Sequence, residues 1–168
     1  MNQDTKIVAT IFILIIVIGG VIFLSSKGQV KKPEQVVLNP EAKLEISKKV
    51  ADLGNMKVSD EKSADFEIKN NGSSTLKIFN VFTSCDCTFA RVLINGKESP
   101  EFNMAMHMPP DALRWAGEIL PNATATIRAI YKPAVMPVFG LVERNIMFST
   151  NDPSNKQVEL TIKASVSK

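Results

Sequence analysis

Residues 158–166 read VELTIKASV, an uninterrupted alternation of apolar and polar side chains. Successive side chains of a β-strand point to opposite faces, so this pattern predicts a strand with one face in a hydrophobic core and the other in water. Further strands are predicted, from the same alternation or from weaker forms of it, at residues 44–47, 55–58, 64–69, 76–82, 91–94, 123–131 and 142–148. In the last of these, Arg144 occupies a position of the same register set as Val142, Ile146 and Phe148.

Turns rich in Asn, Gly and Pro separate these strands, most clearly at residues 70–73 and 151–153. Many short strands punctuated by such turns are typical of an antiparallel β-sandwich of immunoglobulin (Ig) type. The strands do not alternate with helical patterns, which argues against an α/β fold. The sequence therefore predicts an all-β, Ig-like antiparallel β-sandwich over residues 43–168.

The first part of the chain has a different composition. Residues 7–24 read IVATIFILIIVIGGVIFL and contain no charged residue, Pro, Asn or Gln. A run of this length predicts a transmembrane helix, here an uncleaved signal anchor after a short tail at residues 1–6. A cleaved signal peptide is the alternative, but its apolar core is usually shorter and its first residues more basic. Residues 25–42 mix Lys, Pro, Gln and Gly, and predict a tether.

The charges beside the predicted anchor bear on its orientation. Lys6 and the terminal amine precede it, whereas Lys27, Lys31 and Lys32 follow it. By the positive-inside rule this count, which differs by one charge, places the sandwich in the cytoplasm.

The only two cysteines of the chain are Cys85 and Cys87, within Thr83-Ser84-Cys85-Asp86-Cys87-Thr88. In an extended segment, residues i and i+2 lie about 6.6 Å apart with parallel side chains, which is too far for a disulfide. The pair therefore forms a bridge only if the chain turns sharply, giving an easily reduced bond. Otherwise it offers two thiolates to a soft metal, or two small apolar groups to the core. The residues alone leave these three alternatives open.

The stretch at about residues 89–120 is predicted as an elaborated loop, and its composition is unusual. It holds the only His and Trp, and several of the Met residues. Together with the cysteines it supplies ligand types that select copper. The candidate metal ligands are Cys85, Cys87, Met104, Met106, His107 and Met108. The simpler interpretation is that the Met side chains fill gaps in the loop's own small core.

A protein contact patch is a second hypothesis for the same stretch. Trp115 and Phe102, with the Met residues, are its candidate residues, because aromatic side chains are enriched at interfaces. The alternative is that Trp115 closes the open end of the sandwich.

Two classes of function are disfavoured by the sequence. The net charge of +3 is spread along the chain without a basic block, which argues against a nucleic-acid partner. A single His with no Ser-centred elbow and no pair of buried acids satisfies no nucleophile-plus-base arrangement, so an enzyme is not expected.

Several motifs resemble a bacterial family of Ig-like domains of unknown function, which is similar to the Hydin-type domains and carries a Thr-Ser-Cys-Gly-Cys-Thr signature. The matching segments are residues 66–72, Leu76 and Ile78, residues 83–88, 121–133 and 150–153. The resemblance covers about residues 43–166, with Asp86 and Asn122 standing where the family has Gly. It implies an extracytoplasmic, membrane- or lipid-anchored module without an established activity.

Taken together, these features predict a membrane-anchored Ig-like binding or structural module in the periplasm or at the cell exterior. Its localisation follows the resemblance rather than the charge count. We expect a protein partner and a special site at the Cys-x-Cys motif. Copper handling and thiol-redox chemistry are the alternative functions of that motif.

Overall fold

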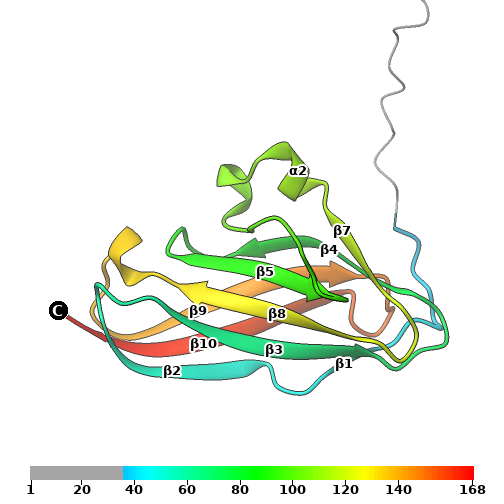
Figure 1. The fold of residues 1–168 in the computed structure, drawn as a ribbon, viewed down its shortest axis with the longest axis horizontal. Coiled ribbons are helices and arrows are strands. Elements are labelled where there is room, and N and C mark those ends of the chain that lie inside the picture. Colours follow the sequence, from blue (N-terminus) through cyan, green and yellow to red (C-terminus); the bar gives the residue numbers. More distant parts are fainter. Residues whose placement is uncertain (1–35) are drawn as a thin grey trace, which may run out of the picture. The chain divides into compact units, whose positions relative to one another are not determined.

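The computed structural model describes residues 36–168, which form two β-sheets packed face to face, with strands running along the long axis (Figure 1). The all-β sandwich expected from the alternating pattern is confirmed for this part of the chain. The predicted tail and anchor and most of the predicted tether lie outside the described residues. Within residues 36–168, no helix is long and apolar enough to cross a membrane.

The first sheet has the strand order β1-β3-β8-β5-β6, and every neighbouring pair in it is antiparallel. Its strands are β1 (Leu44–Ile46), β3 (Lys62–Asn70), β8 (Thr124–Tyr131), β5 (Thr88–Ile94) and β6 (Lys97–Glu98). The second sheet has the order β2-β10-β9-β4-β7. Its strands are β2 (Val50–Lys57), β10 (Gln157–Ser167), β9 (Gly140–Thr150), β4 (Leu76–Thr83) and β7 (Ala116–Ile119).

One pairing differs from the predicted antiparallel arrangement, because β2 runs parallel to β10. The short link between β1 and β2 carries the chain from one sheet to the other without reversing its direction. As a result β2 continues the course of β1 and lies alongside the last strand. The prediction of a wholly antiparallel sandwich is therefore wrong for this edge pair.

The core lies where the alternation places it. Along β10 the apolar set of the VELTIKASV segment is at most 4% exposed, which confirms the predicted inward face. The largest fully buried side chains from both sheets include Phe66, Ile127 and Tyr131 on the first, and Ile78, Ile146 and Phe148 on the second. Burial of this apolar surface from two facing sheets drives the assembly of the sandwich.

Local departures from regular strands occur at residues that accept a left-handed backbone. Gly54, at φ +68°, lies where the β2–β10 register shifts, and Asn80, at φ 51°, lies where the β4–β9 register shifts. Asn122, at φ 63°, turns the chain between β7 and β8. Asn tolerates this conformation better than most residues, so it replaces the family's Gly in this turn at small cost.

The predicted long loop is partly regular. β5 occupies its beginning and β7 its end, and between them lie β6, a 3₁₀ turn η1 (Ala105–His107) and a single helical turn α2 (Pro110–Leu113). Phe102 ties this insertion to β5 through reciprocal backbone hydrogen bonds with Ala90 of 2.8 and 2.9 Å. The insertion is therefore an ordered part of the sandwich.

The two ends of the sandwich are chemically different. The end at which the chain leaves residues 36–42 and begins β1, here called the tether end, contains the buried polar residues Asn70, Asn151 and Asp152. The opposite end, here called the far end, contains the Cys85–Cys87 turn, the segment 134–141 and the C-terminus (Figure 1).

Buried side chains at the tether end bond to the backbone. Asn70 donates to the carbonyl oxygens of Ser74 (2.8 Å) and Ile119 (2.9 Å) and accepts from the amide of Gly72 (2.9 Å). Asp152 accepts from the amide of Leu44 (3.0 Å). These bonds satisfy backbone groups where strands of both sheets end.

Candidate functional site

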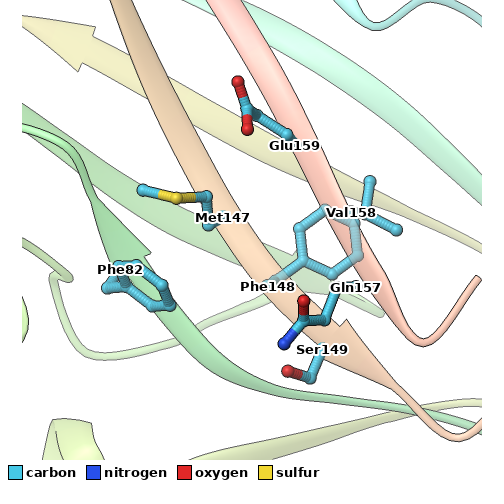
Figure 2. Close-up of a pocket in the computed structure, with 7 residues that line it drawn as sticks. All are labelled: Phe82, Met147, Phe148, Ser149, Gln157, Val158 and Glu159. Atoms are coloured by element: carbon cyan, nitrogen blue, oxygen red, sulfur yellow. The ribbon is translucent and has the colours of Figure 1, made fainter.

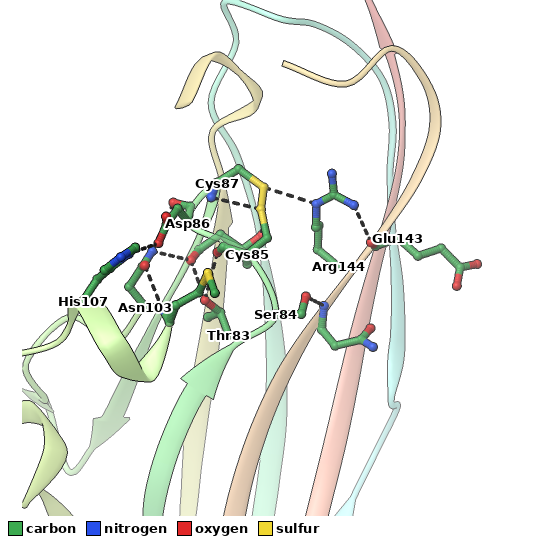
Figure 3. The surroundings of a disulfide bond; sticks show 12 residues. Thr83, Ser84, Cys85, Asp86, Cys87, Asn103, His107, Glu143 and Arg144 are labelled. Atoms are coloured by element: carbon green, nitrogen blue, oxygen red, sulfur yellow. Dashed lines mark hydrogen bonds and ion pairs between the residues drawn. A yellow bond between two sulfur atoms is a disulfide. The ribbon is translucent and has the colours of Figure 1, made fainter. Parts of the chain in front are cut away.

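The cysteine motif forms the turn by which the chain passes from β4 in one sheet to β5 in the other. Cys85 and Cys87 form a disulfide, and their Cα atoms lie 5.3 Å apart, closer than in an extended strand (Figure 3). Both residues are also buried, at 9% and 0% exposure. Of the three alternatives that the residues left open, the structure therefore contains the bridge, placed within the core. Asp86 fits the turn without a positive φ, since Asn80, Asn95 and Asn122 are the non-Gly residues of 36–168 that have one.

Hydrogen bonds that do not involve the sulfurs hold the same turn. The Thr83 hydroxyl lies 3.1 Å from the carbonyl oxygen of Cys85 and 2.9 Å from that of Thr88. Asn103, from the insertion, donates to the carbonyl oxygens of Asp86 (3.1 Å) and Thr88 (2.9 Å). The turn thus has a backbone-directed frame in addition to its covalent bond (Figure 3).

Arg144 reaches the disulfide from β9 in the facing sheet. Its Nε donates to Cys87 Sγ over 3.2 Å, and its guanidinium lies 5.8 Å above the ring of Tyr131. A terminal nitrogen donates to the carbonyl oxygen of Glu143 over 2.9 Å. The ion pairs formed among residues 36–168 do not include Arg144. Its charge is therefore directed at sulfur and at an aromatic face rather than at a carboxylate.

The structure places the candidate metal ligands around this turn without gathering them. His107 Nδ1 lies 2.5 Å from Asp86 Oδ1, Met106 is 76% exposed, and Met104 and Met108 are half-buried. Within residues 36–168, no three His, Cys, Asp or Glu side chains form a group that could hold a metal ion. In the disulfide form neither sulfur is a thiolate, so copper binding by Cys85 and Cys87 stays a prediction for the reduced protein.

An open cavity of about 580 Å³ borders the turn. Its lining includes Asp86 and Phe89 from the turn and β5, Asn103 and His107 from the insertion, and Val135 from the far-end segment. The His107–Asp86 pair forms its polar side. Among residues 36–168 no hydroxyl or thiol is hydrogen-bonded to His107, so the pair lacks the nucleophile that a catalytic dyad activates.

A second, smaller hollow of about 240 Å³ lies on the outer face of the second sheet (Figure 2). Phe82 and Met147 form its apolar side, and Gln157 and Glu159 its polar side. The Glu159 carboxylate accepts a hydrogen bond of 2.6 Å from the Asn145 amide. The carboxylate that lines this hollow is therefore already bonded to a neighbouring amide.

The predicted aromatic contact patch is largely internal. Phe102 is fully buried, and its ring meets that of the half-buried Trp115 edge-to-face, with centroids 5.2 Å apart. A Cβ atom placed on Gly117 would lie 2.5 Å from the Trp115 ring, so the indole covers this glycine. Phe102 has no exposed surface with which to contact a partner. In this structure the pair packs the insertion onto the sandwich.

A run of exposed apolar side chains lies elsewhere, in the segment 134–141, which comprises most of the connection from β8 and the first two residues of β9, Gly140 and Leu141. This segment reads AVMPVFGL, and all of its residues are exposed. Val135 is 50% exposed, Phe139 50% and Leu141 90%. The alternating pattern does not predict this exposed run, because Pro133 and Pro137 interrupt the alternation there. Prolines at positions 133 and 137 cannot donate to a strand ladder, so an apolar run around them indicates an exposed connection ahead of β9.

Comparisons with known proteins agree with this architecture. A protein of unknown function from Porphyromonas gingivalis W83 matches with a TM-score of 0.55 and 20% identity, over 79% of this chain and 51% of the other. The present chain thus spans about half the length of that protein. A family 123 glycoside hydrolase from Clostridium perfringens matches with a TM-score of 0.50 and 10% identity, over 74% of this chain and 27% of the other. At such low identities these likenesses show the fold alone.

No curated protein sequence matches the chain. A family model does match it, over residues 42–165, which agrees with the extent of the expected resemblance. That span covers the core strands, the Cys85–Cys87 turn and the far-end segment. The chain therefore belongs to the HYDIN/CFA65/VesB-like family of Ig-like domains.

Proposed function

We propose that this chain is a membrane-anchored, extracytoplasmic Ig-like module that binds a protein partner through the far-end segment 134–141. The observation that carries the proposal is the run of exposed apolar side chains in this segment. Val135, Met136, Val138, Phe139 and Leu141 are each between 43% and 90% exposed. Contiguous apolar exposure of this kind marks interaction sites, and binding residues are concentrated on loops held by a rigid scaffold.

The position of the segment suits this role. It emerges from β8 and leads into β9, two strands with long registers in the interiors of the two sheets. It also lies at the end of the sandwich opposite to the start of β1 (Figure 1). A partner can therefore reach the segment without displacing the residues that connect the sandwich to its tether.

Charges beside the segment favour a protein partner over a lipid surface. Lys132 precedes it and pairs with Glu61 at 3.0 Å, while Glu143 follows it and pairs with Lys163 at 2.5 Å. An apolar centre with a rim of both signs is the usual anatomy of a protein interface. A loop that inserts into anionic lipid instead carries an excess of Lys and Arg at its edge.

Membrane anchoring and extracytoplasmic localisation rest on the sequence. The apolar run 7–24 has the length of a spanning helix, and the resemblance implies a module outside the cytoplasm. We expect no catalytic activity. The copper alternative has no further support from the described geometry and needs free thiols at Cys85 and Cys87.

Photo-crosslinking in native membranes tests the proposal. A photoreactive benzoylphenylalanine replaces Phe139 in the full chain, and a matched control carries it at Leu120, which is 55% exposed at the tether end. We expect a discrete protein adduct from position 139, absent from position 120 and weakened by Leu141→Ser. Lipid adducts alone, or equal adducts from both positions, would contradict a protein-binding far end.

A further inference from the structure

We infer that the Cys85–Cys87 disulfide is a thiol-exchange site that accepts two electrons from a dithiol, with Cys85 as the attacked sulfur and Cys87 as the leaving thiolate. The proposed partner binding does not use the cysteine motif, and this inference gives the motif a chemical role of its own. The inference rests on the size of the bridged loop, the unequal environments of the two sulfurs and the placement of Arg144.

The bridge adds little to the framework of the turn. It joins residues separated by two positions, and cross-links that close such short loops restrict the unfolded chain least. The turn is independently held by the Thr83 hydroxyl and by the two hydrogen bonds from Asn103. Opening the bridge therefore leaves most of the local structure in place, as a reversible exchange requires.

The two sulfurs are not equivalent. Cys87 is fully buried, whereas Cys85 keeps 9% of its surface exposed, so Cys85 is the residue of the pair that solvent reaches. Cys85 Sγ accepts a hydrogen bond of 3.0 Å from the neutral amide of Cys87, whereas Cys87 Sγ accepts a charge-assisted one of 3.2 Å from Arg144 Nε. A guanidinium beside a sulfur favours the thiolate over the thiol, and a better-stabilised thiolate leaves faster.

Arg144 occupies an unusual position for such a charge. It follows the inward register of Val142 and Ile146 on β9, where apolar residues are expected, and is half-buried there. Among the described residues it pairs with no carboxylate, and it stacks on Tyr131 instead. Its charge is thus not neutralised by an acid and remains available to a thiolate on Cys87.

The exchange takes place in two steps. A thiolate of the dithiol attacks Cys85 Sγ and forms a mixed disulfide, while the Cys85–Cys87 bond breaks and its electron pair goes to Cys87 Sγ beside Arg144. The second thiol of the reductant, once deprotonated, attacks the reductant's first sulfur, which is bonded to Cys85 Sγ in the mixed disulfide. Cys85 leaves as a thiolate and takes a proton from water, so the protein gains two electrons and the reductant becomes a disulfide.

The test measures how fast dithiothreitol reduces the purified full chain in detergent, with thiols trapped by maleimide and counted by mass spectrometry. We expect no free thiol before reduction, and about ten-fold slower reduction in Arg144→Gln. Arg144→Lys, which keeps the charge without the Nε donor, should be intermediate. Arg128→Gln is the matched control, because Arg128 pairs with Asp65 on an exposed strand face. The disulfide of this variant should be reduced at the wild-type rate.

The direction of the change separates chemistry from loosened structure. A variant that merely opened the turn would be reduced faster, whereas loss of a stabilised leaving group slows the reaction. In Cys87→Ser, Cys85 should form a mixed disulfide with an aromatic disulfide reagent in the folded protein, and in Cys85→Ser, Cys87 should not. Equal or faster reduction in Arg144→Gln, reaction of Cys87 in preference to Cys85, or free thiols in the purified protein would overturn the inference.

Discussion

The two ends of the sandwich differ in the side chains that hold them and in the apolar surface that lies beside them. At the tether end, buried amide and carboxylate groups bond to backbone groups, with Asn70 fully buried and Asp152 3% exposed. The far end contains the short Cys85–Cys87 turn and the apolar segment 134–141, which is exposed to solvent. Buried polar groups that are fully bonded rigidify a structure, whereas exposed apolar groups add little to the stability of the isolated chain.

This difference indicates a division of labour. The tether end stabilises the fold, and the far end presents the exposed segment 134–141 and the Cys85–Cys87 disulfide to other molecules. Substitutions should therefore reduce stability at the tether end and leave it nearly unchanged in the far-end segment. The following predictions test this division, in order of decreasing effect on stability.

The largest loss is expected for Asn70→Ala. The substitution leaves the carbonyl oxygens of Ser74 and Ile119 and the amide of Gly72 without their partner, in a fully buried site. We expect a loss of about 3 kcal/mol, or a fall of about 10 °C in melting temperature. Fluorescence of the single Trp during heating measures it. Asn71→Ala, at the exposed neighbour, is the control, and an equal melting temperature for both variants would contradict the account.

A smaller loss is expected for Gly117→Ala. The new methyl group would overlap the ring of Trp115 and the end of Ile94, which must both shift. Overpacking of this kind costs about 1–3 kcal/mol, measured as the shift in thermal unfolding followed by circular dichroism. In a Trp115→Leu background, where the indole is absent, Gly117→Ala should cost less stability than it does in the wild type. An equal cost in both backgrounds would show that the indole does not cause the strain.

The carboxylate at the tether end should make stability depend on pH. Burial raises the pKa of Asp152, but hydrogen bonds from Asn155 and from the amides of Leu44 and Ser154 outweigh it, so the pKa lies below its usual value of 3.8. A depressed folded-state pKa stabilises the protein above the unfolded value, and this contribution is lost as pH falls through the folded value. The melting-temperature difference between wild type and Asp152→Asn should thus be constant above about pH 5 and shrink on acidification. A difference that grows instead would reverse the assigned sign.

The smallest effect on stability is expected for Leu141→Ser, although this change should weaken partner binding. Leu141 is 90% exposed, whereas its neighbour Val142 is 6% exposed and belongs to the core. We expect a change within about 0.5 kcal/mol for Leu141→Ser and a loss of at least about 2 kcal/mol for Val142→Ser. Thermal unfolding of the pair measures both. A large loss for Leu141→Ser would mean that the far-end segment is structural.

Much of the fold follows from local patterns. The alternation in residues 158–166 predicted β10 and its inward face, because the period of a strand depends only on its backbone. The parallel pairing of β2 was not accessible in this way, since it depends on the path by which the chain changes sheets. The extent of the insertion was also overestimated. The weak strand predicted at residues 91–94 is the second half of β5, and β7 was too short to be separated from the loop.

The candidate site was predicted less completely. The special character of the Cys-x-Cys motif was visible in its spacing, but the bridge depends on a turn that is held in part by Asn103, a residue of the distant insertion. Arg144 was visible as a charged residue in an inward register, and its sulfur contact required the facing sheet. Phe102 was expected on a surface and is buried, because an aromatic residue in a loop carries no local sign of the direction in which it packs.

Methionine oxidation tests the central claim most directly, because the chain offers an internal pair. Met136 lies in the far-end segment at 47% exposure, and Met106 lies in the insertion at 76%. Oxidation of exposed Met by peroxide is read at each position by mass spectrometry, in native membranes and in vesicles containing only the purified full chain. We predict that Met136 is protected relative to Met106 in native membranes and loses this protection in the vesicles. The same oxidation ratio in both preparations would contradict a far end that is covered by a protein partner.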